Sequence, residues 1–167
     1  IDLAREVCKR LGVELVCQPI SWEAKEQELS SKNIDCIWNA FGLTPEREEA
    51  LTCSKPYATE SSEIVVLKDS SIQTLDDLKG KKGIVQTGSS VLENADAKGI
   101  VDTFGDLTYV EDNVKAMLDL DVSGSDFVII DSLIAGYYMK QNDGKYRYLS
   151  ESLSTDKLGV AFRKGDQ

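Results

Sequence analysis

The chain contains no histidine among its 167 residues, and this absence narrows the chemistry open to it. Histidine is the most frequent general acid–base group of enzymes and a common zinc ligand. The four cysteines form no CxxC pair that would replace it in a metal site. No serine, cysteine or paired-acid set stands out as a catalytic constellation. The sequence therefore predicts a protein that is not an enzyme and needs no metal or cofactor.

Basic residues are also in short supply. Lysine and arginine total 19 against 29 aspartates and glutamates, which gives a formal charge of −10. A nucleic-acid-binding protein usually carries a basic patch, so that class is disfavoured. No apolar run approaches the length of about 20 residues that spans a bilayer. The length suffices for one substantial domain or two small lobes.

The cysteines all lie in the first third of the chain, at Cys8, Cys17, Cys36 and Cys53. They could be small buried apolar groups, since Cys8 falls on an apolar helix face and Cys17 and Cys36 fall in apolar runs typical of strands. One or two disulfides are the alternative, which an exported protein could keep. The pattern favours buried thiols and does not fix any pairing.

Helical and strand patterns alternate along the chain, which predicts α/β layers with mainly parallel sheets. Glycine and capping residues mark several helix ends, such as Gly12 after the first helix and Asn113 before a later one. The expected helices cover residues 1–11, 21–31, 74–80, 91–97, 114–120 and 132–140, and the expected strands cover residues 13–17, 35–38, 61–68, 83–86, 107–110, 126–130, 146–149 and 158–162.

Residues 35–57 carry a strong helix-start signal. A break at residues 39–42 follows the strand 35–38. Thr44 can then cap a helix, and Pro45 fits its first position. Arg47 would lie beside loop N–H groups that are partly free, and this combination suits a carboxylate. From spacing alone, an ion pair with a neighbouring surface acid is the simpler interpretation.

Two further features point to a ligand. The Thr87–Ser90 loop, TGSS, opens a helix, which makes it a candidate anion site, although it lacks the length and lysine of a P-loop. Asp131 follows an apolar strand, at the edge where open α/β sheets bind ligands. Each feature has a simpler interpretation. Ser89 or Ser90 could cap the helix after the TGSS loop, and Asp131 could cap the helix that follows it.

Five segments, in the same order along the chain, resemble the extracellular solute-binding proteins of polar amino-acid ABC transporters, which are solute-binding family 3. These segments are IDLAREVCKRLGVEL, TPEREEALTCSKPY, LDDLKGKKGIVQTGSS, DFVIIDSLIAGYYM and LGVAFRKGD. The resemblance implies a two-lobed type 2 periplasmic-binding-protein fold. Lobe 1 would comprise residues 1–64 and 157–167, lobe 2 residues 65–156, and two strands would form the hinge.

The resemblance also implies that the N-terminal strand and the C-terminal helices of the family fold are missing from this stretch. The stretch would then belong to a longer exported protein and bind its ligand more weakly than that protein does.

The resemblance places a free amino acid between the lobes. Arg47 takes its carboxylate, aided by backbone near Gly42 and by Ser90, and Asp131 takes its ammonium. A ligand that touches both lobes would favour a closed state. Ala40 and Gly42 stand where the family often has glycine and a hydroxyl residue. The ligand-binding residues implied are Trp22, Ala40, Phe41, Gly42, Arg47, Gln86, Ser90 and Asp131.

The expected partners are a free amino acid and the membrane permease of an ABC transporter. The expected location is extracytoplasmic, in a periplasm or as a Gram-positive surface lipoprotein, and a monomer is expected. An amino-acid-sensing input domain of a receptor is the main alternative. A dehydratase-like enzyme on the same fold is a weaker one. The sequence leaves open which amino acid is bound.

Overall fold

A computed structural model describes residues 1–166, and Gln167 lies outside that description. The chain divides into two compact units. Unit 1 is Ile1–Ala58 together with the segment from Lys157, and unit 2 is Thr59–Asp156. The lobe boundaries proposed from the sequence stay a prediction, because the units are defined by packing and not by movement.

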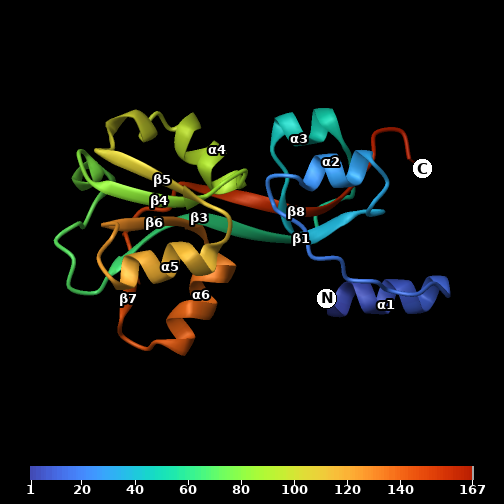
Figure 1. Ribbon diagram of the computed structural model, residues 1–167, viewed down its shortest axis with the longest axis horizontal. Helices are drawn as coiled ribbons and strands as arrows, with labels where there is room; N and C mark the ends of the chain where they lie inside the picture. The colour runs from blue at the N-terminus through green and yellow to red at the C-terminus, as the bar shows by residue number, and fades with distance from the viewer. Residues whose placement is uncertain (167) are drawn as a thin grey trace. The chain divides into compact units, whose positions relative to one another are not determined.

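Unit 1 is a small antiparallel sheet with helices around it. Strands β1 and β2 each pair with β8. In Figure 1, α2 and α3 lie on one side of β1 and α1 lies on the other. Leu29, Phe41 and Ala161 form the centre of its apolar core. Its elements are α1 (Asp2–Leu11), α2 (Lys25–Ser30), β1 (Ile37–Gly42), α3 (Pro45–Ala50), β2 (Thr52–Cys53) and β8 (Ser154–Phe162), whose first residues belong to unit 2.

The first helix ends as predicted, with Gly12 in the left-handed conformation at φ 70°. None of its residues is buried, however. The strand predicted for residues 13–17 does not form, since no neighbouring strand supplies its hydrogen bonds, and Val16 stays 72% exposed. All four cysteines are free thiols, and Cys17 is exposed. The preference for buried thiols is therefore wrong for Cys17, and the other three are only half-buried.

The break predicted at residues 39–42 is wrong, because these residues continue β1. Pairing with β8 runs from Ile37 to Gly42, with a shift of register between Ile37 and Phe41. Ala40 lies in this irregularity with φ +46°, a left-handed conformation that a side chain disfavours. Asn39 and Gly42 are residue types typical of a turn, but β8 provides the hydrogen-bond partners that make this segment a strand.

Helix starts follow the predicted caps in part. Thr44 accepts a hydrogen bond from the Arg47 amide, and a capping box at Thr74 begins the short 3₁₀ helix η1 (Leu75–Leu78). Asp112, not Asn113, caps the helix that was expected from residue 114. Helix α2 begins only at Lys25, although it was expected from residue 21.

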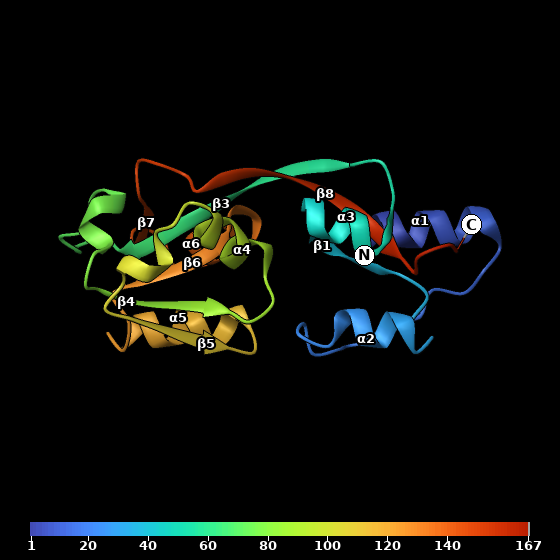
Figure 2. The same cartoon turned by 90° about the horizontal axis from the view of Figure 1, so that it is seen from above.

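Unit 2 is a layered sheet, and Figure 2 shows β3, β6, β4 and β5 side by side in that order. The pairings of β4 with β5 and β6 are parallel, whereas β3 pairs antiparallel with β6 and β7. The other elements are β3 (Ala58–Leu67), β4 (Lys82–Gln86), α4 (Ser90–Ala97), η2 (Val101–Thr103), β5 (Asp106–Val110), α5 (Asn113–Asp121), β6 (Phe127–Asp131), α6 (Ser132–Gln141) and β7 (Tyr146–Tyr148).

The α/β class is confirmed, but the prediction of mainly parallel sheets is wrong. β4 pairs parallel with β5 and β6, whereas β1 and β2 pair antiparallel with β8 and β3 pairs antiparallel with β6 and β7, so the sheets are mixed. Alternation of helices and strands indicates the order of elements but not the direction in which each strand meets its neighbour.

Apolar residues cover both faces of the unit 2 sheet. Along β6, Phe127 and Ile129 pack with α4, whereas Val128 and Ile130 pack with α5 and α6. Successive side chains of a strand point to opposite faces, so Asp131 continues the α4 face. No helix within residues 1–166 is both long and apolar enough to cross a bilayer.

Candidate functional site

Arg47 is the central residue of the candidate site in unit 1. Its side chain is only 4% exposed, in the first turn of α3. The guanidinium Nη1 donates to the Gly42 carbonyl at 3.1 Å, and its central carbon lies 4.8 Å from the centre of the Phe41 ring. The structure therefore brings Phe41, Gly42 and Arg47 together, and the binding of a ligand carboxylate by Arg47 and the backbone near Gly42 stays a prediction.

Trp22 extends this group. Its ring meets that of Phe41 edge to face, with centroids 6.2 Å apart, and the Lys25 Nζ lies 5.4 Å from the Trp22 ring. Ala40, also predicted to contact ligand, precedes Phe41 in the same strand and is half-buried. Of this ring pair Phe41 is fully buried and only Trp22 is half-buried, so Phe41 supports the guanidinium while Trp22 keeps some exposed surface. A held guanidinium near a half-exposed ring suits a ligand with an anionic group and an apolar or planar part.

Asp131 stands at the carboxyl end of β6 in unit 2, where its Oδ1 accepts the Ile134 amide at 3.0 Å. The helix cap weighed from the sequence is therefore real. Burial raises the pKa of the Asp131 carboxyl, and the hydrogen bonds from backbone amides partly offset that rise. A cap leaves further lone pairs on a carboxylate, so capping and cation binding are compatible.

Ser90 and Gln86 lie on different sides of the unit 2 sheet. Ser90 is buried at the start of α4, which covers the same face as Asp131. Gln86 follows Val85, which points to the α4 face, so it points to the α5 face. Its amide donates to the Glu111 carbonyl at 3.1 Å and accepts from Asn113 at 3.0 Å. A ligand would compete with these bonds, and the side-chain-reading role of Gln86 stays a prediction.

Glu60 is an acidic residue beside Asp131 that is not among the ligand residues predicted from the sequence. It lies on β3, is 6% exposed, and its carboxyl is within hydrogen-bonding reach of the Asp131 carboxyl. Burial, and then the negative charges of Asp131 and Asp156, raise the pKa of Glu60 to about 8. The predicted strand began at residue 61, three positions after the start of β3 at Ala58. Extending its alternation backwards would have placed Glu60 on the buried face.

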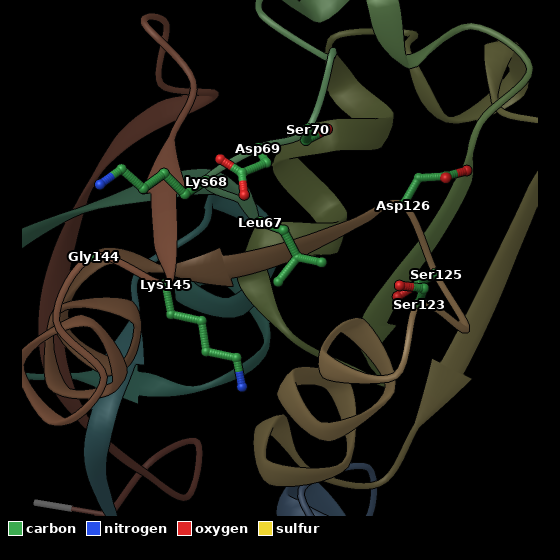
Figure 3. Close-up of a pocket in the computed structure, with 9 residues that line it drawn as sticks. All are labelled: Leu67, Lys68, Asp69, Ser70, Ser123, Ser125, Asp126, Gly144 and Lys145. Carbon is green, nitrogen blue, oxygen red and sulfur yellow. The ribbon is translucent and has the colours of Figure 1, made fainter.

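Unit 2 also has a hollow at a different place. It has a volume of about 430 Å³ and lies between the end of β3 at Leu67 and the residues before β6, among them Ser125 and Asp126 (Figure 3). Asp126 and Asp131 flank opposite ends of β6. Ligands of open α/β sheets bind at the carboxyl ends of strands, and this hollow lies at the amino end of β6. None of the predicted ligand residues lines it.

The family described as "Bacterial extracellular solute-binding proteins, family 3" matches residues 1–167. The chain belongs to this family. Members of solute-binding family 3 bind solutes rather than convert them, in line with the prediction that the chain is not an enzyme.

Named relatives support the assignment to solute-binding family 3. The L-cystine-binding protein TcyJ of Escherichia coli strain K12 is 30% identical over 171 residues, which cover 100% of this chain and 62% of the relative. The arginine-binding extracellular protein ArtP of Bacillus subtilis strain 168 is 29% identical over 170 residues, 100% of this chain and 66% of ArtP. This chain therefore spans less than two thirds of the length of either relative.

A solved family structure shows the same fold. It is the substrate-binding protein of an ABC uptake transporter from Streptococcus pneumoniae with bound histidine. The TM-score is 0.93 at 31% sequence identity, and the match covers 99% of this chain and 70% of that one. The type 2 periplasmic-binding-protein fold predicted from the resemblance is thus confirmed.

Proposed function

We propose that the chain binds a free amino acid and delivers it to the membrane permease of an ABC transporter on the extracytoplasmic side of a membrane. The observation that carries the proposal is Arg47, a buried guanidinium fixed by the Gly42 carbonyl and the Phe41 ring. In a family of solute-binding proteins, such a group is well suited to the carboxylate that all free amino acids share.

The ammonium group of the amino acid pairs with Asp131 in this proposal. Burying either charge of the ligand without an opposite charge would be costly, so a specific site must supply both. Asp131 has the burial and the strand-end position for this role. Ser90, at the start of α4, adds a hydroxyl near a positive helix end, which would assist an anionic group.

The ligand is proposed to be a polar amino acid. The relatives and the solved structure carry cystine, arginine and histidine in their names, and each of these has a polar side chain. Trp22, which is half-buried and packs against the buried Phe41 ring, would meet the apolar or planar part of such a side chain. The protein is proposed to act as a monomer.

A thermal-shift screen tests this proposal. The chain is heated with each of the twenty amino acids and with L-cystine, and binding raises Tm by mass action. We expect one or a few polar amino acids to raise Tm. As matched controls, agmatine lacks the carboxylate of arginine and 5-guanidinopentanoate lacks its α-amino group, so neither should match arginine. If no compound in the set raises Tm, the proposal is wrong.

A further inference from the structure

The carboxyl groups of buried Glu60 and half-buried Asp131 lie side by side at the end of the unit 2 sheet. Strand β3 pairs antiparallel with β6, and Ser62 lies directly opposite Asp131. Glu60, two residues before Ser62, shares its face of the strand and is a diagonal neighbour of Asp131. Their carboxyl groups are within hydrogen-bonding reach of each other. The register of the sheet therefore holds them together.

Glu60 differs from the acids around it in its hydrogen bonds. Asp156 accepts from Ser62, Asn94 and Ser154. Glu63 accepts from the hydroxyls of Ser61 and Ser152. In contrast, no N–H or O–H group of residues 1–166 donates to Glu60 Oε2, which is buried. A buried carboxylate oxygen without a donor is costly, whereas a protonated Glu60 can donate to Asp131.

The charged groups that act on Glu60 are themselves acidic. They are Asp131 on β6 and Asp156 on β8. Tyr148 on β7 lies on the other face of the sheet, opposite Val65. Within residues 1–166, no ion pair joins a cation to Glu60, Asp131 or Asp156. These residues do not form a metal-binding group either. The pair therefore suits an organic cation supplied by a ligand.

We propose that Glu60 is a second ligand-binding carboxyl group of unit 2, which releases the proton it shares with Asp131 when the ammonium group of an amino acid binds to the pair. This inference rests on the proposed function. On binding, the O–H bond of Glu60 breaks and its proton passes to the buffer. The ammonium N–H groups then donate to two carboxylates in place of one shared proton.

Proton release makes affinity depend on pH. The pKa of Glu60 is raised to about 8, so below that pH the ligand must displace a proton. By linkage, affinity rises up to about tenfold for each pH unit between pH 6 and 8. This dependence favours a ligand whose amine is positively charged, because only a cation replaces the proton without leaving two like charges unpaired.

Isothermal titration calorimetry measures this release. The probe is L-arginine, whose guanidinium does not titrate in the range used. We expect the natural chain to release up to one proton per ligand at pH 6.5, seen as a difference in heat between phosphate and Tris buffers. Its Kd should fall up to about 100-fold from pH 6 to pH 8. Glu60→Gln imitates the protonated acid, so its Kd should stay flat and its proton release should vanish.

Glu63→Gln is the matched control, because Glu63 is a buried glutamate of the same strand whose carboxylate is bonded to two hydroxyls instead of Asp131. It should keep the pH dependence of the natural chain. If Glu60→Gln also keeps that pH dependence, the inference is overturned. The proposed function still stands in that case, because the amino acid binds. If no amino acid binds the natural chain, both are overturned.

A ligand-free measurement gives a second test. The folded state keeps the Glu60 proton up to about pH 8, whereas an unfolded glutamate loses it near pH 4.3. The folded state therefore binds more protons between these values, and stability falls as pH rises through this window. Tm should decline from pH 5 to pH 8, and Glu60→Gln should reduce that decline. An equal decline in both proteins would contradict the shared proton.

Discussion

The two units hold their buried charges in different ways. In unit 1 the Arg47 guanidinium is positioned by protein contacts, the Gly42 carbonyl and the Phe41 ring. In unit 2 the carboxyl groups of Glu60 and Asp131 contact each other, and no ion pair of the described chain neutralises them. A ligand carboxylate would thus meet a donor already in position, whereas a ligand ammonium would have to compete with a proton.

The units also differ in packing. Unit 2 has an apolar cluster on each face of its sheet, whereas unit 1 has one cluster of five buried residues. Helix α1 of unit 1 adds no buried residue. A change of one side-chain carbon should therefore alter the free energy of unfolding more in the sheet of unit 2 than at the irregular strand β1 of unit 1, and substitutions in both units can test this.

The largest effect is expected at Asp131, the proposed partner of the ligand ammonium in unit 2. Asp131→Asn removes the charge but keeps a good helix cap, so the free energy of ligand binding should weaken by about 2–5 kcal/mol. The stability of the ligand-free protein should change little or rise, because a buried charge is lost. Calorimetry with the amino acid selected by the screen measures affinity, and thermal unfolding measures stability.

Asp112→Asn is its matched control, since Asp112 caps α5 in the same way by accepting from the Lys115 amide at 2.9 Å. The control should leave affinity unchanged. If Asp131→Asn leaves the affinity unchanged, Asp131 is only a helix cap and does not bind the ligand.

Arg47→Lys tests the positive side. A lysine ammonium cannot reproduce the guanidinium fork, so binding should weaken by about 1.5–3 kcal/mol, the range for a hydrogen bond to a charged group. Arg163→Lys in the same unit is the control, because Arg163 donates to the Leu29 and Ile34 carbonyls and is not a predicted ligand residue. The control should lower stability with little change in Kd. Equal Kd values for Arg47→Lys and the natural chain would remove Arg47 from the site.

Gly83→Ala probes the packing of unit 2. The added carbon would lie 2.6 Å from the Phe127 ring, so the free energy of unfolding should fall by about 1–3 kcal/mol. Gly136→Ala in α6 has only the Tyr148 hydroxyl, at 3.8 Å, near the new carbon, and should raise stability by about 0.5–1 kcal/mol. Urea unfolding of both variants measures whether the free energy of unfolding falls in Gly83→Ala and rises in Gly136→Ala. A stable Gly83→Ala would contradict the tight contact of β4 with β6.

The smallest effect is expected in unit 1. Ala40 has φ +46°, which costs about 1–2 kcal/mol for a residue with a side chain. Ala40→Gly relieves this strain but gives glycine more freedom in the unfolded chain, so the net gain should be about 0.5–1 kcal/mol. Urea unfolding checks the gain, and a loss of stability would show that the Ala40 methyl group contributes packing that outweighs the strain.

Local sequence signals determined much of this protein. Thr44 and Pro45 start α3 and place Arg47 in its first turn, and the apolar run that ends at Asp131 is a buried strand followed by a helix. Each signal acts within a few residues, through capping or through the period of apolar side chains, so it can be interpreted without knowing the partners of the segment. The family was indicated differently, by the resemblance of five segments to motifs of solute-binding family 3 in the same order.

Only the tertiary structure decided which segments find partners. Residues 39–42 are a strand because β8 pairs with them, and residues 13–17 are not because no strand does. Glu60 gains its role from the register of β3 on β6, which brings its carboxyl to Asp131. Strand pairing, burial and charge proximity join residues far apart in the chain, and the chemistry of a carboxyl group depends on those neighbours more than on its own sequence context.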